Sequence, residues 1–322
     1  MTSLFQGLIA PLAAGLTMFL FGMKVIEFAL FQWTGELMKT TLKKLTRSPF
    51  RGLVVGTGTT ALLQSSSAVT VVTIGFVNAG ILTFPQTLGI ILGTNIGSCL
   101  TTELIGLRFT KNMLPALIVS ASVWIALIAV PETRIRALNR LANALRGISL
   151  AVAGFSCLLL ALDIMQAIVP YLQERGFLAW FIDRAQTSPL WGIAAGACLS
   201  AAIHSSAAAI AITMGFASLG LLPVDLGIAV ILGSNIGTCV TAMIAAVGGS
   251  RYGQYVAWSH LLLNVGGTVL FYPLIGLLER TVAAIASDPA SQLAHAQTLF
   301  NVVCSLIALP FCYLPALKRI QA

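Results

Sequence analysis

Residues 64–68 read Gln-Ser-Ser-Ser-Ala, and residues 93–99 read Gly-Thr-Asn-Ile-Gly-Ser-Cys. The pattern returns 140 residues later, where residues 204–208 read His-Ser-Ser-Ala-Ala and residues 233–239 read Gly-Ser-Asn-Ile-Gly-Thr-Cys. The sequence around all four blocks is mostly apolar, so a small polar motif is repeated inside hydrophobic surroundings. Any account of the fold has to explain this duplication.

The composition places the chain in a membrane. Its 322 residues are 57% hydrophobic and 9% charged, with a mean hydropathy of +0.94, whereas soluble domains carry roughly 25% charged residues. A spanning helix needs about 20 mostly apolar residues. Seven stretches meet this need, so we interpret the whole chain, 1–322, as a single all-α polytopic transmembrane domain. The predicted spans lie at about 7–31, 86–107, 113–130, 147–169, 224–247, 254–278 and 294–316.

The duplicated segments extend beyond the polar blocks. Residues 52–102 align on 192–242 without a gap, and 19 of the 51 aligned positions are identical. The Ser-rich centre of each segment favours a re-entrant helical hairpin, whose non-helical tip survives only where protein or water surrounds it. The Gly-x-Asn-Ile-Gly block predicts a short break in the following helix, because glycine permits local unwinding. In a membrane chain, such segments at corresponding places in two halves point to a transporter's substrate site.

The basic residues predict the orientation. With the N-terminus outside and both hairpins re-entrant, 12 of the 18 Lys and Arg residues fall inside and 5 outside, as the positive-inside rule requires. Arg108 and Lys111 agree least well with this orientation, because it places these two basic residues close together on the outside. This threading makes the two halves inverted repeats and leaves the C-terminus cytoplasmic. We expect repeat 1 over about 7–130, repeat 2 over about 147–278 and an extra C-terminal helix at 294–316.

Several other classes of function are disfavoured. The six cysteines show no zinc-ligand or disulfide spacing, and the net charge of +8 is explained by loops beside anionic lipid. We therefore expect no cofactor, no metal beyond a coupling ion and no nucleic-acid partner. His204 and Ser205 raise the alternative of an intramembrane hydrolase. Adjacent residues seldom provide nucleophile-to-base geometry, and no third orienting carboxylate is evident, so we predict that the chain is not an enzyme.

The duplicated motif has the chemistry to bind an anion and a cation together. Hydroxyls and freed backbone carbonyls are hard-oxygen ligands suited to sodium, whereas hydroxyl protons, amides and the N–H groups of a helix start can hold an oxyanion. Two inverted hairpins would bring their tips together near the midplane, where one site is reached from each side in turn. The alternative interpretation is packing, because Ser, Thr and Gly are common where membrane helices meet.

On these motifs the chain resembles the sodium/phosphate cotransporter family, type II and its bacterial relatives. The resemblance is carried by Gln-Ser-Ser-Ser-Ala followed by Gly-Thr-Asn-Ile-Gly, and by the second such block. It extends over nearly the whole chain through residues 20–24 (Leu-Phe-Gly-Met-Lys), 161–165 (Ala-Leu-Asp-Ile-Met), 260–264 (His-Leu-Leu-Leu-Asn) and 297–301 (Gln-Thr-Leu-Phe-Asn). It implies sodium-driven import of inorganic phosphate across a bacterial inner membrane, with both Ser motifs forming one shared site.

We expect two overlapping sets of ligands. Phosphate at pH 7 is an anion, and burying it without cations would be strongly unfavourable, so cotransported sodium offsets its charge. The expected phosphate-binding residues are Gln64, Ser65, Ser66, Asn95, His204, Ser205, Ser206 and Asn235. The expected sodium-binding residues are Ser66, Ser67, Thr94, Thr101, Ser206, Ser234, Thr238 and Thr241.

The second motif departs from the family pattern, which repeats Gln-Ser-Ser-Ser. His204 replaces the Gln, and Ala207 removes a hydroxyl that could bind sodium. Because an unperturbed His titrates at about pH 6.5, we hypothesise that His204 donates to the bound oxyanion and makes transport pH-dependent. A neutral His that only fills the Gln space is the alternative. The asymmetry also leaves open another oxyanion or a small carboxylate as cargo, or an uncoupled anion channel.

Further expectations concern isolated polar residues and partners. Lys24 and Asp163 occupy corresponding places in the two halves and are predicted to pair, unless both reach water at helix ends. We leave Glu103 out of the site, and we interpret the polar pairs in 260–264 and 297–301 as interhelical contacts before substrate ligands. The remaining expected partners are membrane lipid, a second copy in a homodimer and a separate cytoplasmic regulator, since relatives append a regulatory domain.

Overall fold

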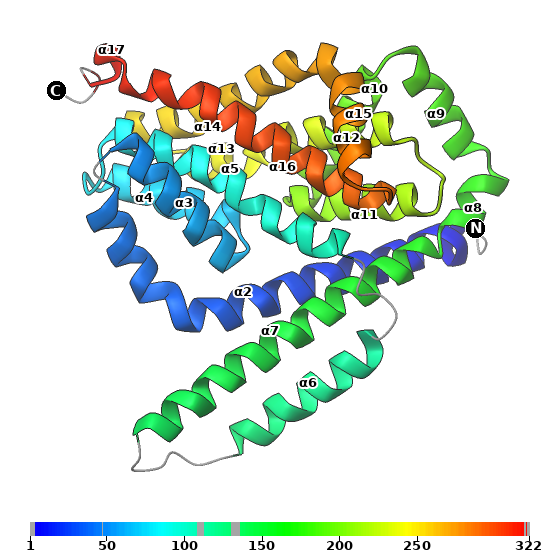
Figure 1. The fold of residues 1–322 in the computed structure, drawn as a ribbon, viewed down its shortest axis with the longest axis horizontal. Helices are drawn as coiled ribbons and strands as arrows, with labels where there is room; N and C mark the ends of the chain where they lie inside the picture. Colours follow the sequence, from blue (N-terminus) through cyan, green and yellow to red (C-terminus); the bar gives the residue numbers. More distant parts are fainter. Residues whose placement is uncertain (1–3, 47, 108–112, 130–135, 319, 321–322) are drawn as a thin grey trace. The chain divides into compact units, whose positions relative to one another are not determined.

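The computed structural model describes residues 4–46, 48–107, 113–129, 136–318 and 320, and this part of the chain is helical with no strand (Figure 1). The chain divides into two compact units, Met1–Leu37 with Arg108–Arg175 and Met38–Leu107 with Gly176–Ala322. Both duplicated segments lie in the second unit. The predicted repeat boundaries, 7–130 and 147–278, stay predictions. Some basic residues of the predicted orientation lie outside the described residues: Arg47, Arg108, Lys111, Arg134 and Arg319.

The first unit is built on close contact between two long helices. Its elements are η1 (Phe5–Ile9), the first part of α2 (Ala10–Leu45), α6 (Met113–Ile128), α7 (Arg136–Gln166) and α8 (Val169–Glu174). A Cβ added to Gly22 of α2 would lie 2.6 Å from the carbonyl oxygen of Gly154 in α7. Only glycine allows two helix backbones to approach this closely.

The predicted ion pair between Lys24 and Asp163 is wrong. Lys24 Nζ instead lies 2.6 Å from Oε2 of Glu27, three residues along the same helix. The Lys24 side chain is 75% exposed, and Asp163 is exposed as well. Since residues three apart are neighbours on a helix surface, Lys24 finds its partner without the other half of the chain.

The second unit contains two helical hairpins, each followed by a helix that packs against the first arm. The first set is α3 (Pro49–Leu63), α4 (Ser66–Asn78) and α5 (Phe84–Gly106), and the second is α10 (Leu190–Ile203), α11 (Ser206–Ser218), α12 (Val224–Gly237) and α13 (Cys239–Ala246). The remaining elements are α9 (Phe177–Thr187), α14 (Arg251–Phe271), η3 (Tyr272–Leu274), α15 (Ile275–Ile285), α16 (Pro289–Ala308), η4 (Leu309–Tyr313) and α17 (Pro315–Lys318). A hairpin at each duplicated Ser motif was the sequence prediction.

The hairpin arms are too short to cross a membrane. α3 has 15 residues and α4 has 13, which correspond to about 22 Å and about 20 Å of helix. The hydrocarbon core is about 30 Å thick. The lengths agree with hairpins that enter and leave on one side.

Six helical segments in the described part of the chain are long and apolar enough to span a membrane. They are Phe5–Phe31, Phe84–Gly106, Leu141–Glu174, Val224–Ala246, Arg251–Ile285 and Pro289–Tyr313. These segments match six of the seven predicted spans. The seventh prediction, 113–130, corresponds to α6, whose 16 residues fall short of that length. The all-α polytopic membrane fold is confirmed.

The helix break predicted at 93–97 is wrong. α5 continues as one helix from Phe84 to Gly106. Gly93 serves close packing instead of unwinding, because an added Cβ would overlap the carbonyl oxygen of Leu53 in α3. One turn further along, a Cβ on Gly97 would lie 2.6 Å from the carbonyl oxygen of Thr57. The spaced glycines therefore allow α3 and α5 to run side by side in the same direction.

The second set of helices repeats this arrangement with one difference. A Cβ on Gly233 of α12 would overlap the carbonyl oxygen of Ile193 in α10, and Gly237 meets Ala197 in the same way. Here the helix is interrupted, but only at Thr238, between α12 and α13. The interruption follows the Gly-Ser-Asn-Ile-Gly block instead of lying within it.

Candidate substrate and sodium site

The tips of the two hairpins have the same backbone geometry. Gln64 ends α3 with φ 54° and ψ 26°, and His204 ends α10 with φ 58° and ψ 27°. They are the only non-glycine residues with positive φ in the described part of the chain. This left-handed conformation costs on the order of 1 kcal/mol in residues that carry a Cβ. Its occurrence at two equivalent positions marks both tips as candidate functional sites.

Each tip begins the second arm of its hairpin with a serine cap. Ser65 Oγ accepts from the backbone N–H of Ala68, and Ser205 Oγ accepts from that of Ala208, both at 3.2 Å. The first N–H groups of a helix have no partner within the helix. The cap satisfies one of these donors on each arm, and the N–H of Ser205 also donates to the carbonyl oxygen of Ser200 at 3.3 Å. The N–H groups of the first two residues of each arm have no hydrogen-bond partner among the described residues, so they are left for a different acceptor.

Three serines after the caps keep their hydroxyls available. Ser66 and Ser67 are half-buried, and Ser206 is 6% exposed. Among the described residues, no hydrogen bond uses the hydroxyl of any of them. A hydroxyl donates one proton and accepts at two lone pairs, so these side chains can bind an anion or a cation.

A threonine contacts each tip from the neighbouring helix, 37 residues further along the chain. Thr101 Oγ1 donates to Gln64 Oε1 at 2.6 Å, while Gln64 Nε2 donates to the carbonyl oxygen of Ala61 at 2.5 Å. In the second hairpin, His204 Nδ1 and Thr241 Oγ1 lie 3.3 Å apart, and the tautomer decides which donates. The structure thus brings Gln64 to Thr101 and His204 to Thr241, two contacts at corresponding positions of the duplicated segments.

Asn95 joins the first duplicated segment to α14. Its Nδ2 donates to Asn264 Oδ1 at 3.1 Å, and its Oδ1 lies 3.2 Å from His260 Nε2. Asn264 Nδ2 also donates to Cys239 Sγ at 3.1 Å. These contacts agree with the interhelical role expected of residues 260 and 264. The Nδ1 atom of His260 is buried with no hydrogen-bond partner among the described residues.

α16 carries polar residues that correspond to His260 and Asn264 of α14. Asn301 Nδ2 donates to Cys99 Sγ at 3.4 Å, as Asn264 does to Cys239. Gln297, the counterpart of His260, is 1% exposed, and its Oε1 has no partner among the described residues. The helices α14 and α16 therefore bear equivalent polar residues against the two duplicated segments.

Four of the predicted site residues have no hydrogen bond to a tip residue in the described part of the chain. Thr94 Oγ1 donates to the carbonyl oxygen of Ile91, and Ser234 Oγ donates to that of Val230. Asn235, which is 3% exposed, donates to the carbonyl oxygen of Ile231. Thr94 and Asn235 are thus engaged within their own helices, whereas Ser234 Oγ also lies 3.4 Å from the carbonyl oxygen of Gly196 in α10. Thr238 lies at the interruption between α12 and α13.

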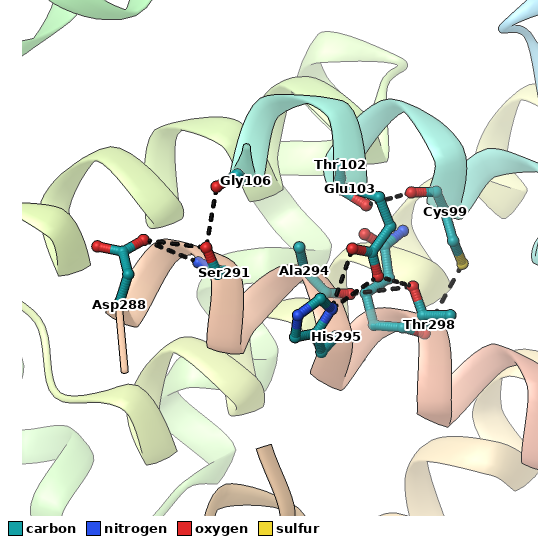
Figure 2. Close-up of polar contacts among 10 residues, drawn as sticks. Cys99, Thr102, Glu103, Gly106, Asp288, Ser291, Ala294, His295 and Thr298 are labelled. Carbon is teal, nitrogen blue, oxygen red and sulfur yellow. Dashed lines mark hydrogen bonds and ion pairs between the residues drawn. The ribbon is translucent and has the colours of Figure 1, made fainter. Parts of the chain in front are cut away.

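Sequence reasoning missed a cluster at the contact between α5 and α16. Glu103 Oε1 accepts from Thr298 Oγ1 at 2.5 Å, and His295 Nδ1 lies 3.0 Å from Glu103 Oε2 (Figure 2). Glu103 is the only charged residue in α5. A single charge in an otherwise uncharged helix was the sequence signal that could have indicated this cluster. Its partners lie 192 and 195 residues away, so no local pattern could reveal them.

Comparison with known proteins places these features in a family. The sequence model of the Na+/Pi-cotransporter family matches residues 18–167 and 173–305. Uncharacterized protein YqeW of Bacillus subtilis (strain 168) is 33% identical over 301 residues, which cover 91% of each chain. No solved structure matches.

Two relatives have names that state a function. The Putative inorganic phosphate export protein YjbB of Escherichia coli (strain K12) is 25% identical over 93% of this chain and 53% of its own. This chain therefore spans about half the length of that relative. The Sodium-dependent phosphate transport protein 2A of Rattus norvegicus is 35% identical over 101 residues, which cover 30% of this chain and 16% of its own. The family match covers most of the sequence, including both hairpins, and the chain belongs to the Na+/Pi-cotransporter family.

Proposed function

We propose that the chain is a sodium-coupled carrier of inorganic phosphate that works by alternating access. The observation that carries this proposal is the pair of equivalent tips, each with a left-handed end residue, a serine cap and a threonine partner. Family membership supports phosphate as the cargo. Phosphate transport is also what the names of the YjbB and type 2A relatives state.

Phosphate is proposed to bind where the second arm of each hairpin begins. The free hydroxyls of Ser66 and Ser206 and the first N–H groups of α4 and α11 are suitable donors, and a helix start carries partial positive charge. Gln64 and His204 lie beside these donors in the chain. Ser65 and Ser205 are proposed to hold the tips in shape by capping α4 and α11. Asn95 and Asn235 lie in α5 and α12, the helices that follow the two hairpins.

Sodium is proposed to bind to oxygens at and behind the same tips. Ser67 and the threonine pair Thr101 and Thr241 supply hydroxyls there, and Ser66 and Ser206 can be shared with the anion. Thr94, Ser234 and Thr238 complete the proposed set. Burying phosphate alone would be strongly unfavourable, so the loaded carrier with its sodium ions is closer to neutral and can change conformation.

The direction of transport is proposed to follow the gradients. A coupled carrier runs either way, and an inward sodium gradient at a bacterial inner membrane would drive phosphate inward. One relative is named for export and another for sodium dependence. Both descriptions are compatible with a reversible symporter, and the orientation in the membrane remains as predicted from the basic residues.

Phosphate uptake into proteoliposomes tests the proposal. We expect uptake of labelled phosphate under an inward sodium gradient, little uptake when potassium replaces sodium, and a loss of about tenfold or more in Ser66→Ala and Ser206→Ala. Ser218→Ala is the matched control, because Ser218 Oγ donates to Met214 within α11, far along the helix from the tip. Equal uptake without sodium would favour a channel, and stronger competition by sulfate or dicarboxylates than by unlabelled phosphate would show another cargo.

A further inference from the structure

One face of α9 is covered by protein. The helix runs from Phe177 to Thr187 and packs against α10 and α12 (Figure 1). Leu178 and Ala185, which are 9% and 5% exposed, lie about two turns apart and therefore on the same face. The remaining surface of α9 is exposed, and it is not uniform.

One exposed edge of α9 is aromatic. Phe177 and Trp180 are 55% and 48% exposed, and their ring centroids lie 5.7 Å apart. Trp191, near the start of α10, is 46% exposed, and its ring lies edge-on to that of Trp180 with the centroids 6.3 Å apart. The three rings of Phe177, Trp180 and Trp191 form one exposed surface at the start of the second hairpin, which we call the aromatic rim.

The exposed side next to the aromatic rim is polar. Asp183, Gln186 and Thr187 are all exposed, and residues spaced by three and four lie on one face of a helix. Within the described part of the chain, the Asp183 carboxylate takes part in no ion pair. This face of α9 therefore requires water or polar lipid headgroups.

The two exposed faces together exclude both the hydrocarbon core and bulk water as the surroundings of α9. A lone carboxylate such as that of Asp183 is costly in the hydrocarbon core, and three large rings in water would form an exposed apolar patch. α14 shows the contrast, because its exposed residues from Trp258 to Leu270 include no charge. The boundary between acyl chains and water suits both faces of α9, and aromatic residues are enriched there.

We propose that α9 lies in the plane of the membrane surface and that the aromatic rim binds the lipid interface. The rings lie among the upper parts of the acyl chains, and the polar face meets headgroups and water. The 11 residues of α9 correspond to about 16 Å of helix, too short to cross a membrane. Amphipathic helices that lie in this plane bury their apolar face roughly 5–10 Å into the boundary.

The first hairpin begins in similar surroundings. The offset of 140 places Arg51 opposite Trp191, and Phe50 precedes it. Phe50 and Arg51 are both exposed, and the backbone N–H of Phe50 donates to Tyr313 Oη at 3.1 Å. Aromatic and basic side chains thus also surround the start of α3. The predicted inverted orientation would place the starts of the two hairpins at opposite boundaries of the membrane.

The aromatic rim sets the depth of a hairpin tip. His204 follows Trp191 by 13 residues, which is about 20 Å along a helix, and the hydrocarbon core is about 30 Å thick. A rim held at the boundary therefore brings the tip toward the middle of the membrane. This consequence for transport rests on the proposed function, whereas the lipid contact itself does not.

Fluorescence quenching by brominated lipids tests the depth of the rim. The chain has five tryptophans, and one variant keeps only Trp191, with the other four replaced by phenylalanine. In vesicles, we expect phosphatidylcholine brominated near the headgroup end of its acyl chains to quench Trp191 more than the same lipid brominated near the methyl end. A variant that keeps only Trp258 is the matched control and should show the reverse. Trp258 is 52% exposed and lies about 10 Å along α14 from Arg251.

A single conservative change gives the same comparison if these variants do not fold. The difference in fluorescence between the wild type and Trp191→Phe isolates the signal of Trp191. Stronger quenching of Trp191 by the deeply brominated lipid would place the rim in the hydrocarbon core and overturn the proposal. Quenching by neither lipid would overturn it too, because water or protein would then cover the rings, and cross-linking of two copies would identify a second chain as the occupant.

Phosphate uptake into proteoliposomes provides a second readout. Trp191→Tyr keeps an aromatic ring with a polar end, which suits the interface, and should retain the initial rate of uptake. Trp191→Leu keeps only the apolar character and should lower that rate. Equal rates in the two variants, or a lower rate in Trp191→Tyr, would overturn the role of the rim in setting the depth of the tip. Failure of wild-type uptake would overturn the proposed function and leave the quenching result standing.

Discussion

Gln64 and His204 share one backbone conformation and differ in chemistry. Both residues end the first arm of a hairpin in the left-handed region, and both have a threonine partner on the next helix. The first contact is a short hydrogen bond to an amide oxygen of a half-buried side chain, and the second is longer and involves an exposed imidazole. The two tips are therefore equivalent in shape but not in how firmly the end residue is held.

Removing the two threonine hydroxyls should expose this difference. We expect Thr101→Val to lower the initial rate of phosphate uptake about tenfold, since an amide oxygen that loses its buried donor costs about 1–3 kcal/mol. Thr241→Val should lower the rate less than about threefold, because the 3.3 Å contact of His204 is weaker. Thr102→Val is the control, as the Thr102 hydroxyl donates to Cys99 within α5. Equal losses at both threonines would contradict the asymmetry.

Replacing His204 by Gln should make the second tip resemble the first. Thr241 can then donate to an amide oxygen, so we expect Thr241→Val to become as harmful in the His204→Gln background as Thr101→Val is in the wild type. If His204 donates to the bound anion, the substitution should also flatten the pH profile of uptake, because an imidazole can gain a proton and a glutamine amide cannot. An unchanged profile would leave only the space-filling role for His204. Initial uptake rates between pH 5.5 and about pH 8 provide the measurement.

At the residue scale, the duplication of the sequence was the strongest signal. The two Ser motifs and the threonines Thr101 and Thr241 could be chosen as candidates because they recur at an offset of 140, but the contacts of these threonines with Gln64 and His204 were not predicted. The left-handed backbone of Gln64 could not be predicted, since this conformation is rare outside glycine. The Glu103 cluster could not be predicted either, because its partners on α16 have no counterpart in the duplicated pattern.

At the scale of the helices, the Gly-x-x-x-Gly spacing had two possible meanings. Glycine both permits unwinding and allows helix backbones to touch, and sequence alone does not separate these roles. The break predicted at 93–97 rested on the first role. The continuous α5 and its close approach to α3 at Gly93 establish the second. The hairpins themselves could be predicted because each duplicated segment has a Ser-rich centre flanked by glycines, which does not suit a single span.

Substituting Gly93 should test how much this close packing stabilises the second unit. Because an added Cβ would overlap backbone atoms of Leu53 and Thr57, Gly93→Ala forces the helices apart, and overpacking of this kind typically costs about 1–3 kcal/mol. We expect a clear fall in the melting temperature of the purified protein in detergent. Gly75→Ala in α4 is the control, since nothing lies within 4 Å of its added Cβ. A melting temperature unaltered by Gly93→Ala would refute the packing role.

At the scale of the molecule, composition and duplication were sufficient to predict the class of protein but not its division into two compact units. The apolar content required a polytopic membrane fold, and the helices agree with it. The two compact units do not follow the order of the chain, because the first unites Met1–Leu37 with Arg108–Arg175. Such a division depends on contacts between distant helices such as those at Gly22 and Gly154, which a hydropathy pattern does not contain.

The balance of gradients across the membrane tests sodium coupling in the whole carrier. If two sodium ions move with each phosphate, a tenfold phosphate gradient, worth about 1.4 kcal/mol, is balanced by about a threefold opposing sodium gradient at zero membrane potential. Reversing the sodium gradient should then reverse net phosphate flux in proteoliposomes.

Ala207 replaces the hydroxyl that Ser67 supplies in the first hairpin, so Ala207→Ser restores the full serine set. If that hydroxyl completes a sodium site, the variant should need a smaller sodium gradient to balance the same phosphate gradient. Ala208→Ser, one residue further along α11, is the control, and a balance point that Ala207→Ser leaves unmoved would show that the second hairpin gains no sodium ion from the third serine.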